Sequence, residues 1–418
     1  MQTHLADFIR DTPAGREADA ILRKCVHCGF CLATCPTYQL LGDELDGPRG
    51  RIYLIKQVLE GATATAKTQL HLDRCLTCRA CETTCPSGVD YGRLVDIGRH
   101  VVDTQVGRGA AESVIRKALR TVIPSPSRFA LLLKLGKLMR PVLPRALKRK
   151  IPSPARAIPW PTSSHARKML VLEGCVQPSL SPNTNAATAR VFDRLGIQLT
   201  RAPRAGCCGA VPYHLNAQTE GLDYARRNID AWWPHVEQGI EAIVMTASGC
   251  ATMVAEYGHL LSRDPAYAGK AARISALMKD VSEVIAAEKQ KVLSLLNSKP
   301  ETQNSKFAFH PPCSLQHGLR MKGKVEALLR GLGFDLTPVP DSHLCCGSAG
   351  TYSILQSELS QQLLDNKIAA LTSGAPSAII TANIGCQSHL QTATGLPVMH
   401  WIEALDARLL QSEKTSSN

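Results

Sequence analysis

The spacing C-x₂-C-x₂-C-x₃-C-P occurs twice near the start of the sequence, as CVHCGFCLATCP at residues 25–36 and CLTCRACETTCP at residues 75–86. Three closely spaced thiolates can surround one [4Fe–4S] cube, and the fourth cysteine of such a motif characteristically binds the other cluster of a pair. Structural zinc also uses C-x₂-C pairs, but it would leave the third cysteine and the Cys-Pro unexplained. The motifs therefore predict two neighbouring clusters that pass on single electrons.

The two motifs resemble those of two-cluster ferredoxins, and this resemblance implies how eight cysteines are shared between the clusters. One cluster would be bound by Cys25, Cys28, Cys31 and Cys85. The other would be bound by Cys75, Cys78, Cys81 and Cys35. Apolar residues at helical spacing between the motifs predict a small, mainly helical domain over residues 1–110.

Two arginines, Arg49 and Arg51, lie between the motifs in the stretch DGPRGR. Positive charge beside a cluster would raise its potential by opposing the negative charge of the cluster. The simpler interpretation, which we favour, is a turn and a helix start with solvated arginines.

Positive charge is concentrated in one segment of the chain. Fourteen of the 48 Lys and Arg residues, but none of the 35 Asp and Glu residues, lie between Ser113 and Leu170. Residues 111–167 are also rich in proline and are interpreted as a basic linker with short amphipathic helices. We expect this linker to lie on an anionic membrane surface, and the alternatives are a solvated linker or an acidic groove on a partner subunit. The basic residues assigned to membrane binding are Lys134, Lys137, Arg140, Arg145, Lys148, Arg149 and Lys150.

The sequence indicates a reducing compartment, although it contains sixteen cysteines. Its first fifteen residues lack the apolar region of a signal peptide, and no apolar run approaches the roughly 18–20 residues of a membrane-spanning helix. Clustered thiols in such a chain more often bind metal than form disulfides. We expect a peripheral protein on the cytoplasmic face of the bacterial inner membrane.

Residues 168–418 are predicted to be an internal repeat, with copies at 168–300 and 301–418. In each copy a strand-like run ends in a cysteine, and 31 residues separate it from a Cys-Cys-Gly. An asparagine follows the second of these cysteines by 20 residues, at Asn228 and Asn366. Alternation of strand-like and helical patterns predicts a parallel α/β core in each copy.

Each copy contains four matching cysteines. They are Cys175, Cys207, Cys208 and Cys250 in the first copy, and Cys313, Cys345, Cys346 and Cys386 in the second. Four thiolates suffice for one cubane, so one or two further iron–sulfur clusters are expected here. The alternatives are a redox-active dithiol, a disulfide, or buried cysteines without a ligand.

The duplicated pattern resembles the cysteine-rich CCG domain of the heterodisulfide reductase B family, which is also found in a subunit of glycerol-3-phosphate dehydrogenase and in lactate-utilisation proteins. The fullest pattern of that family ends in C-x₂-C, but this sequence has Ala247 and Asn383 at the position of the extra cysteine. The resemblance implies an α/β fold: an N-terminal α-helical ferredoxin-like domain followed by two tandem CCG repeats.

Five histidines lie near these cysteines in the sequence. They are His214, His310, His317, His343 and His389. A single histidine is more often a surface residue or a hydrogen-bonded core residue than a metal ligand, so none is assigned to metal.

Longer stretches, among them CPTYQLLGDELDGPRGRIYLIKQVLEG and DSHLCCGSAGTYS, resemble the family of iron–sulfur subunits of bacterial glycolate oxidase. This resemblance implies partner subunits that contain FAD and oxidise glycolate to glyoxylate, with (R)-lactate as a second substrate. The chain would pass their electrons toward a membrane quinone or another respiratory acceptor. No nucleotide-binding G-x-G-x-x-G follows a strand, so neither a flavin site nor catalytic residues are expected in this chain.

Three other functions are weighed against this one. The chain could serve a dehydrogenase for glycerol-3-phosphate or lactate, or it could reduce a substrate disulfide at a CCG site. The missing fifth cysteine of each repeat argues against disulfide reduction. Nucleic-acid binding is suggested only by charge, and the confinement of that charge to one linker argues against it.

Overall fold

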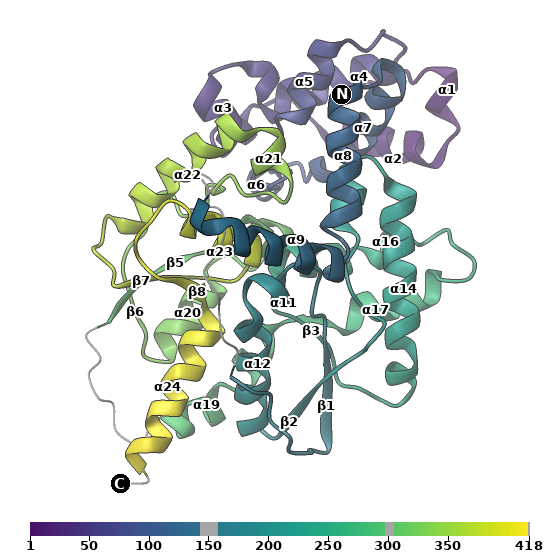
Figure 1. Cartoon of the computed structure of the whole chain (residues 1–418). Coiled ribbons are helices and arrows are strands. Elements are labelled where there is room, and N and C mark those ends of the chain that lie inside the picture. The colour runs from purple at the N-terminus through teal and green to yellow at the C-terminus, as the bar shows by residue number, and fades with distance from the viewer. Residues whose placement is uncertain (143–157, 297–304, 417–418) are drawn as a thin grey trace.

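Three parts follow one another along the chain in the computed structural model, which describes residues 1–142, 158–296 and 305–416. Helices of the N-terminal part, purple in Figure 1, lie across one end of two α/β units, one teal and one green to yellow. No helix in the described ranges is long and apolar enough to cross a membrane.

The N-terminal part is built from helices and short 3₁₀ turns. Their bounds are α1 (Asp7–Arg10), α2 (Pro13–Lys24), η1 (Phe30–Leu32), α3 (Pro36–Leu41), η2 (Glu44–Asp46), α4 (Pro48–Leu59), α5 (Ala66–Asp73), α6 (Ala80–Thr84) and α7 (Tyr91–Val106). Proline occupies the first position of α2, α3 and α4, where the missing N–H costs no hydrogen bond. The apolar faces of α2, α4 and α7 form one core around Leu22, Ile55, Leu59 and Leu94.

Two more helices, α8 (Ala110–Val122) and α9 (Pro126–Met139), follow, together with the turn η3 (Arg140–Val142). In Figure 1, α8 descends from the N-terminal part and α9 crosses in front of the repeats. Neither helix has a buried residue, which sets them apart from the helices of the N-terminal core. Arg145, Lys148, Arg149 and Lys150 lie outside the described residues.

The first α/β unit has a parallel four-stranded sheet in the order β2-β1-β3-β4. Its strands are β1 (Arg167–Val171), β2 (Ile197–Arg201), β3 (Ile243–Met245) and β4 (Met278–Asp280). Its helices are α11 (Gln177–Leu180), α12 (Pro182–Arg194), α13 (Ala210–His214), α14 (Gln218–Glu237), α15 (Ser248–Ala255), α16 (Tyr257–Leu260), α17 (Ala268–Leu277), α18 (Val281–Ala287) and α19 (Lys289–Leu296).

The second α/β unit repeats this sheet in the equivalent order β6-β5-β7-β8. Its strands are β5 (Lys306–His310), β6 (Asp335–Leu336), β7 (Ala378–Thr381) and β8 (Val398–His400). Its helices are α20 (Lys324–Gly331), α21 (Tyr352–Leu355), α22 (Ser357–Thr372), α23 (Ile384–Gln391) and α24 (Trp401–Ser416), with a π-helical turn η4 at Ser314–Gly318.

The two repeats share one hydrophobic core. Buried residues of both sheets and of α12, α18, α20 and α24 belong to a single cluster, which includes Phe192, Val244, Phe309 and Trp401. At its edge Arg190 of α12 forms a buried ion pair with Asp406 of α24, at 2.5 Å. The predicted fold class, a helical ferredoxin-like part followed by two parallel α/β repeats, is confirmed.

The sequence match between Asn228 and Asn366 is not a structural match. Asn228 is fully buried in α14, whereas Asn366 is exposed on α22. Gly209 packs on Gly221 and Gly347 packs on Ser360, so the helix after the second CCG carries one additional residue before the contact. Lys367, which is 3% exposed, therefore takes the place of Asn228.

Candidate iron–sulfur sites

A cavity between the two N-terminal motifs is lined by five cysteines. They are Cys25, Cys28, Cys31, Cys81 and Cys85. The apolar side chains of Val26, Phe30 and Ile52 complete its wall. Four of the five thiols are those expected to share one cluster, and they reach the cavity from both motifs. A group of thiols around one cavity fits an iron–sulfur cluster.

A second cavity lies on the other side of Cys81. It is lined by Cys35, Cys75, Cys78 and Cys81, together with Arg51 and Tyr91. These four thiols are the set expected for the other cluster. Because Cys81 lines both cavities, the two sites are neighbours.

The loops that carry the thiols have the same backbone conformation in both motifs. His27 and Gly29 have positive φ angles of 57° and 85°, and the matching residues Thr77 and Arg79 have 52° and 60°. Left-handed residues turn backbone N–H groups inward, and the N–H of Thr77 lies 3.4 Å from Sγ of Cys75. Both loops are therefore shaped to surround anionic sulfur.

The surroundings of the second cavity correct one expectation from the sequence. Arg51 is not solvated but 1% exposed. Its guanidinium donates to the carbonyl oxygen of His71 at 2.6 Å and to Oγ1 of Thr37 at 3.1 Å, and it pairs with the buried Asp46 at 3.3 Å. A buried polar network satisfies the arginine, so it can remain charged beside the thiols. The solvated interpretation holds better for Arg49, whose side chain is 34% exposed and pairs with Glu44.

Burial makes these thiols poor acids while they carry protons. It raises the pKa of Cys31 to about 11, and it raises the pKa values of Cys78 and Cys81 well above their ordinary range. The hydroxyl of Tyr91 lies 3.7 Å from Sγ of Cys75 and is buried like the thiols. Because metals bind thiolates, assembly of a cluster must displace these protons.

The first repeat brings its four cysteines together at the carboxyl ends of β1, β2 and β3. Cys207 shares hydrogen bonds with Cys175 and Cys208, and these bonds raise the pKa of Cys207. Cys208 is also hydrogen-bonded to Cys250, and the hydrogen bonds from Cys207 and Cys250 lower the pKa of Cys208. The carboxyl edge of a parallel sheet is where such folds bind ligands.

The second repeat groups its cysteines in the same way, after β5, β6 and β7. Sγ of Cys313 lies 3.9 Å from Sγ of Cys345. Cys345 is hydrogen-bonded to Cys346, and Cys346 is hydrogen-bonded to Cys386. Both repeats therefore offer a compact set of four thiols, the donor type that iron–sulfur clusters use.

Glycine is required directly after each cysteine pair. Gly209 and Gly347 have φ angles of 89° and 85°. A side chain at Gly209 would meet the carbonyl oxygen of Gly221 at 2.3 Å, and one at Gly347 would meet that of Ser360 at 2.6 Å. The glycines let the cysteine loops approach the following helix closely, which fixes the thiols in place.

Different side chains support the two cysteine loops. In the first repeat the amide of Asn228 accepts from the N–H of Gly206 at 2.9 Å and donates to the carbonyl oxygen of Cys207 at 2.8 Å. The hydroxyl of Tyr257 donates to the carbonyl oxygen of Cys208 at 2.8 Å. In the second repeat the ammonium of Lys367 donates to the carbonyl oxygen of Asp341 at 2.9 Å. Neither Tyr257 nor Lys367 was identified from the sequence.

The second repeat lies directly against the second N-terminal cavity. Cys78 belongs to one apolar cluster with Leu76, Tyr352, Cys313 and Cys345. Burial raises the pKa of Cys78, and the nearby Cys313 raises it further. The thiols of the second repeat are thus neighbours of thiols from the ferredoxin-like part.

The first repeat meets the ferredoxin-like part through polar contacts. Arg79 pairs with Glu256 at 2.5 Å, and His214 lies 3.3 Å from Asp96. A cavity of about 660 Å³ lies between α7 and the helices α13 and α15 at this junction.

The structure places the other histidines as follows. Nδ1 of His317 lies 2.7 Å from Oγ1 of Thr83 and so joins the second repeat to α6. His389 lies 3.2 Å from Oγ of Ser360, and His343 is half-buried. His310 is 1% exposed, and one of its ring nitrogens lies within 4.8 Å of Sγ of Cys346 and of Cys386. The sequence places His310 near Cys313 but does not show that its ring faces these two thiols.

Comparisons with known proteins agree with this geometry. Residues 21–89 match the model of the 4Fe-4S dicluster domain, and residues 169–255 and 307–391 each match that of the Cysteine-rich domain called CCG. The chain is 30% identical over 243 residues to Lactate utilization protein A of Bacillus licheniformis, covering 56% of this chain and 97% of that protein.

Two relatives extend over most of the chain. The Probable glycolate oxidase iron-sulfur subunit of Bacillus subtilis is 30% identical over 395 residues, which cover 87% of each chain. The Glycolate oxidase iron-sulfur subunit of Escherichia coli K12 is 57% identical over 410 residues, covering 98% of this chain and 99% of that one. The resemblance inferred from the motifs is thereby confirmed, and the chain belongs to the family of glycolate oxidase iron–sulfur subunits.

Proposed function

We propose that this chain is the electron-transfer subunit of a membrane-associated complex that oxidises glycolate to glyoxylate. FAD-containing partner subunits would carry out the substrate chemistry, and a membrane quinone or another respiratory acceptor would take the electrons. The observation that carries the proposal is the pair of neighbouring cavities lined by thiols from both motifs. Iron–sulfur clusters accept and release one electron at a time.

The ligands proposed for the first site are Cys25, Cys28, Cys31 and Cys85, and for the second Cys35, Cys75, Cys78 and Cys81. The exposed Cys28 and the half-buried Cys78 offer a test, because each lines only one of the two cavities. We expect Cys28→Ser and Cys78→Ser each to remove a different cluster signal from the electron paramagnetic resonance spectrum of the anaerobically purified complex. Loss of the same signal from both variants would contradict the assignment.

The two repeats are proposed to bind further iron–sulfur clusters through their four thiols each. Iron and acid-labile sulfide per chain measure this directly. About eight of each would mean that only the N-terminal sites bind clusters, whereas about twelve or sixteen would add one or two clusters in the repeats. Zinc without sulfide would contradict an electron-transfer function for the chain.

Attachment to the membrane is proposed to run through α9. Its exposed apolar residues lie on one side of the helix: Leu131, Leu132, Leu135, Leu138 and Met139. Lys134, Lys137 and Arg140 accompany them, and each basic residue near an anionic bilayer contributes about 1 kcal/mol. An apolar side flanked by basic residues favours a helix that lies in the interface.

The test is sedimentation with vesicles that contain an anionic lipid. Replacing Lys134, Lys137 and Arg140 by Gln should release the protein from the vesicles. A control with three exposed lysines of the repeats replaced, Lys279→Gln, Lys322→Gln and Lys324→Gln, should remain bound. Unchanged sedimentation of the α9 variant would reject membrane attachment by this helix and favour a partner groove.

(R)-lactate is proposed as a second substrate of the same complex. The similarity to Lactate utilization protein A supports a link to lactate, although it covers only 56% of the chain. The purified complex should reduce a quinone analogue with glycolate and with (R)-lactate, and activity with glycerol-3-phosphate instead would point to a different dehydrogenase.

A further inference from the structure

One position beside the thiols differs in chemical character between the repeats. Three residues before the first cysteine the first repeat has Leu172, whereas the second has His310. Five residues before the last cysteine the first repeat has Met245, whereas the second has Thr381. All four side chains are buried. An apolar pair in one copy is thus a polar pair in the other, at the same place in the sheet.

His310 and Thr381 of the second repeat are hydrogen-bonded to each other. Nδ1 of His310 lies 3.0 Å from Oγ1 of Thr381, and the Thr381 hydroxyl donates to the backbone carbonyl oxygen of His310 at 3.0 Å. Because a hydroxyl has one proton, Oγ1 can only accept from the ring. Nδ1 therefore carries the ring proton, and Nε2 has a free lone pair.

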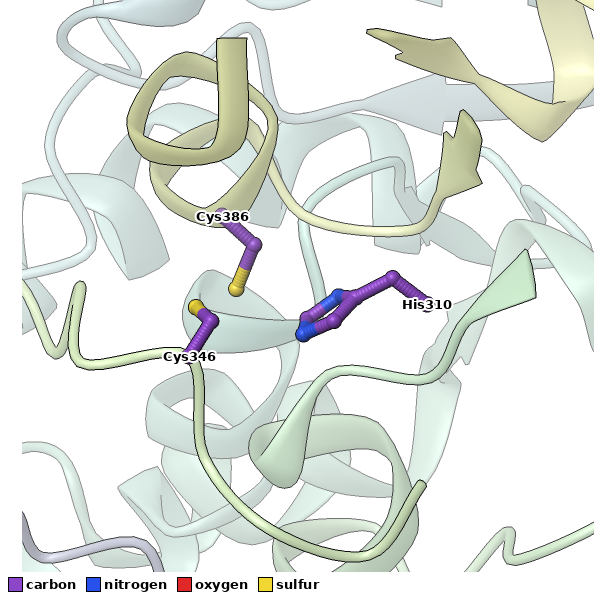
Figure 2. A group of neighbouring side chains, drawn as sticks. All are labelled: His310, Cys346 and Cys386. Atoms are coloured by element: carbon purple, nitrogen blue, oxygen red, sulfur yellow. The ribbon is translucent and has the colours of Figure 1, made fainter. Parts of the chain in front are cut away.

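That lone pair faces sulfur. Figure 2 shows the imidazole of His310 directed at the thiols of Cys346 and Cys386. One ring nitrogen of His310 and the two Sγ atoms all lie within 4.8 Å of one another. Nε2 is buried and has no hydrogen-bond partner among the residues that the structure describes. A buried acceptor without a donor is costly, and thiolates beside it would add repulsion. A cation bound between the nitrogen and the sulfurs removes both penalties.

We propose that Nε2 of His310 is a metal ligand in the second repeat, alongside the thiolates of its cysteines, and that the first repeat uses thiolates alone. Metal-binding histidines commonly donate their other ring N–H to a fixed acceptor, and Thr381 provides that acceptor here. Iron, in an iron–sulfur cluster, and zinc are both metals that accept imidazole and thiolate together. The inference rests on the proposed function only in requiring metal in the second repeat.

The experiment uses the anaerobically purified complex with ¹⁵N-labelled histidine in this chain. If the metal is iron, the reduced cluster of the second repeat should show a ¹⁵N hyperfine coupling in pulsed electron paramagnetic resonance. If the metal is zinc, X-ray absorption at the zinc edge should show mixed sulfur and nitrogen ligation. Cys346→Ser and Cys386→Ser identify the signal of this repeat, because they should remove it.

Two histidine variants complete the test. His310→Leu, which introduces the residue of the first repeat, should abolish the nitrogen signal, and the matched control His343→Leu, at the half-buried histidine two residues before Cys345, should retain it. A metal signal in the second repeat with no nitrogen coupling in the unmutated protein would overturn the inference while leaving the proposed function intact. Absence of any metal signal that depends on Cys346 would overturn both the inference and the proposal that this repeat binds metal. The unmutated protein gives the decisive reading, so a variant that fails to fold does not block the test.

Discussion

The two cysteine-rich repeats have the same sheet order and the same four thiols, yet their surroundings differ. The first repeat surrounds its thiols with Leu172, Met245 and the amide of Asn228, whereas the second uses His310, Thr381 and the ammonium of Lys367. Among the described residues, it is the second repeat whose thiols lie beside Cys78 of the ferredoxin-like part. The two copies therefore keep the same sheet and the same thiols but differ in the residues around the thiols.

The largest difference is expected when one thiol of each repeat is removed. Cys346→Ser should lower glycolate-dependent reduction of a quinone analogue by about tenfold or more, because its site adjoins the Cys78 site. Cys208→Ser should lower that rate much less. Steady-state rates of the purified complex measure the effect, with the spectra of the two N-terminal clusters as a control for folding. Equal losses in both variants would erase the functional difference between the repeats.

Support of the cysteine loops gives the next largest effect. Asn228→Ala leaves the buried N–H of Gly206 and the carbonyl oxygen of Cys207 without partners, so it should lower the free energy of unfolding by about 2–4 kcal/mol. Lys367→Met should lower the free energy of unfolding by a similar amount, because it leaves the carbonyl oxygen of Asp341 without its donor.

The exposed Asn366 is the matched control for this pair. Although the sequence aligns it with Asn228, Asn366→Ala should change stability by less than about 0.5 kcal/mol. Denaturant unfolding measures all three variants. A large effect of Asn366→Ala, or none of Lys367→Met, would contradict the one-residue offset between the repeats.

Lowering the pH should have opposite effects on the stability that the last strands of the two sheets contribute. By strand register Asp280 and His400 hold equivalent places, opposite Met245 and Thr381. Burial raises the pKa of Asp280 to about 6 and lowers the pKa of His400 to about 3. The stability from neutral His400 is present above its ordinary pKa of about 6.5 and is lost as the pH falls toward 3. The stability from protonated Asp280 is present below about pH 4 and is lost as the pH rises through 6.

Because His400 stays neutral in the folded protein, lowering the pH from 7 to 5 should reduce its contribution to the free energy of unfolding by about 2 kcal/mol. His400→Asn keeps an acceptor for the N–H of Ile402, which His400 binds at 3.1 Å, but it does not titrate. On acidification from pH 7 to pH 5 this variant should gain thermal stability relative to the unmutated protein, because Asp280 then acts without the opposing effect of His400. An unchanged slope would show that His400 does not produce the difference.

The smallest effect is expected at Asn383, whose counterpart in the first repeat is Ala247. Nδ2 of Asn383 lies 3.4 Å from Sγ of Cys386, and hydrogen bonds to sulfur raise the potential of a cluster. Asn383→Ala should lower the potential of the second repeat by on the order of 40 mV, the equivalent of about 1 kcal/mol for one electron. A redox titration measures the shift, and Ala247→Gly, in the first repeat, should leave this potential unchanged.

The sequence predicted those features that depend on short spacing or on a strict repeat. The N-terminal motifs and the duplicated cysteines each lie in local patterns, and the parallel α/β fold follows from alternating strands and helices. Contacts between residues that are far apart in the chain could not be predicted from the sequence. His310 and Thr381 meet across 71 residues, and Arg51 is buried because Asp46 and the backbone of His71 receive it. The additional residue before the contact of Gly347 with Ser360 also has no sequence signal. The apolar spacing of a helix stays the same when the helix rotates by one residue.

The core that the two repeats share has a consequence for how such a chain can evolve. Trp401 of the second repeat and Phe192 of the first belong to the same buried cluster, so neither half has to hold its fold unaided. A repeat that is stabilised by packing against the other repeat tolerates substitutions near its thiols that would unfold it if it stood alone. We therefore expect heat to unfold the two repeats in one cooperative transition.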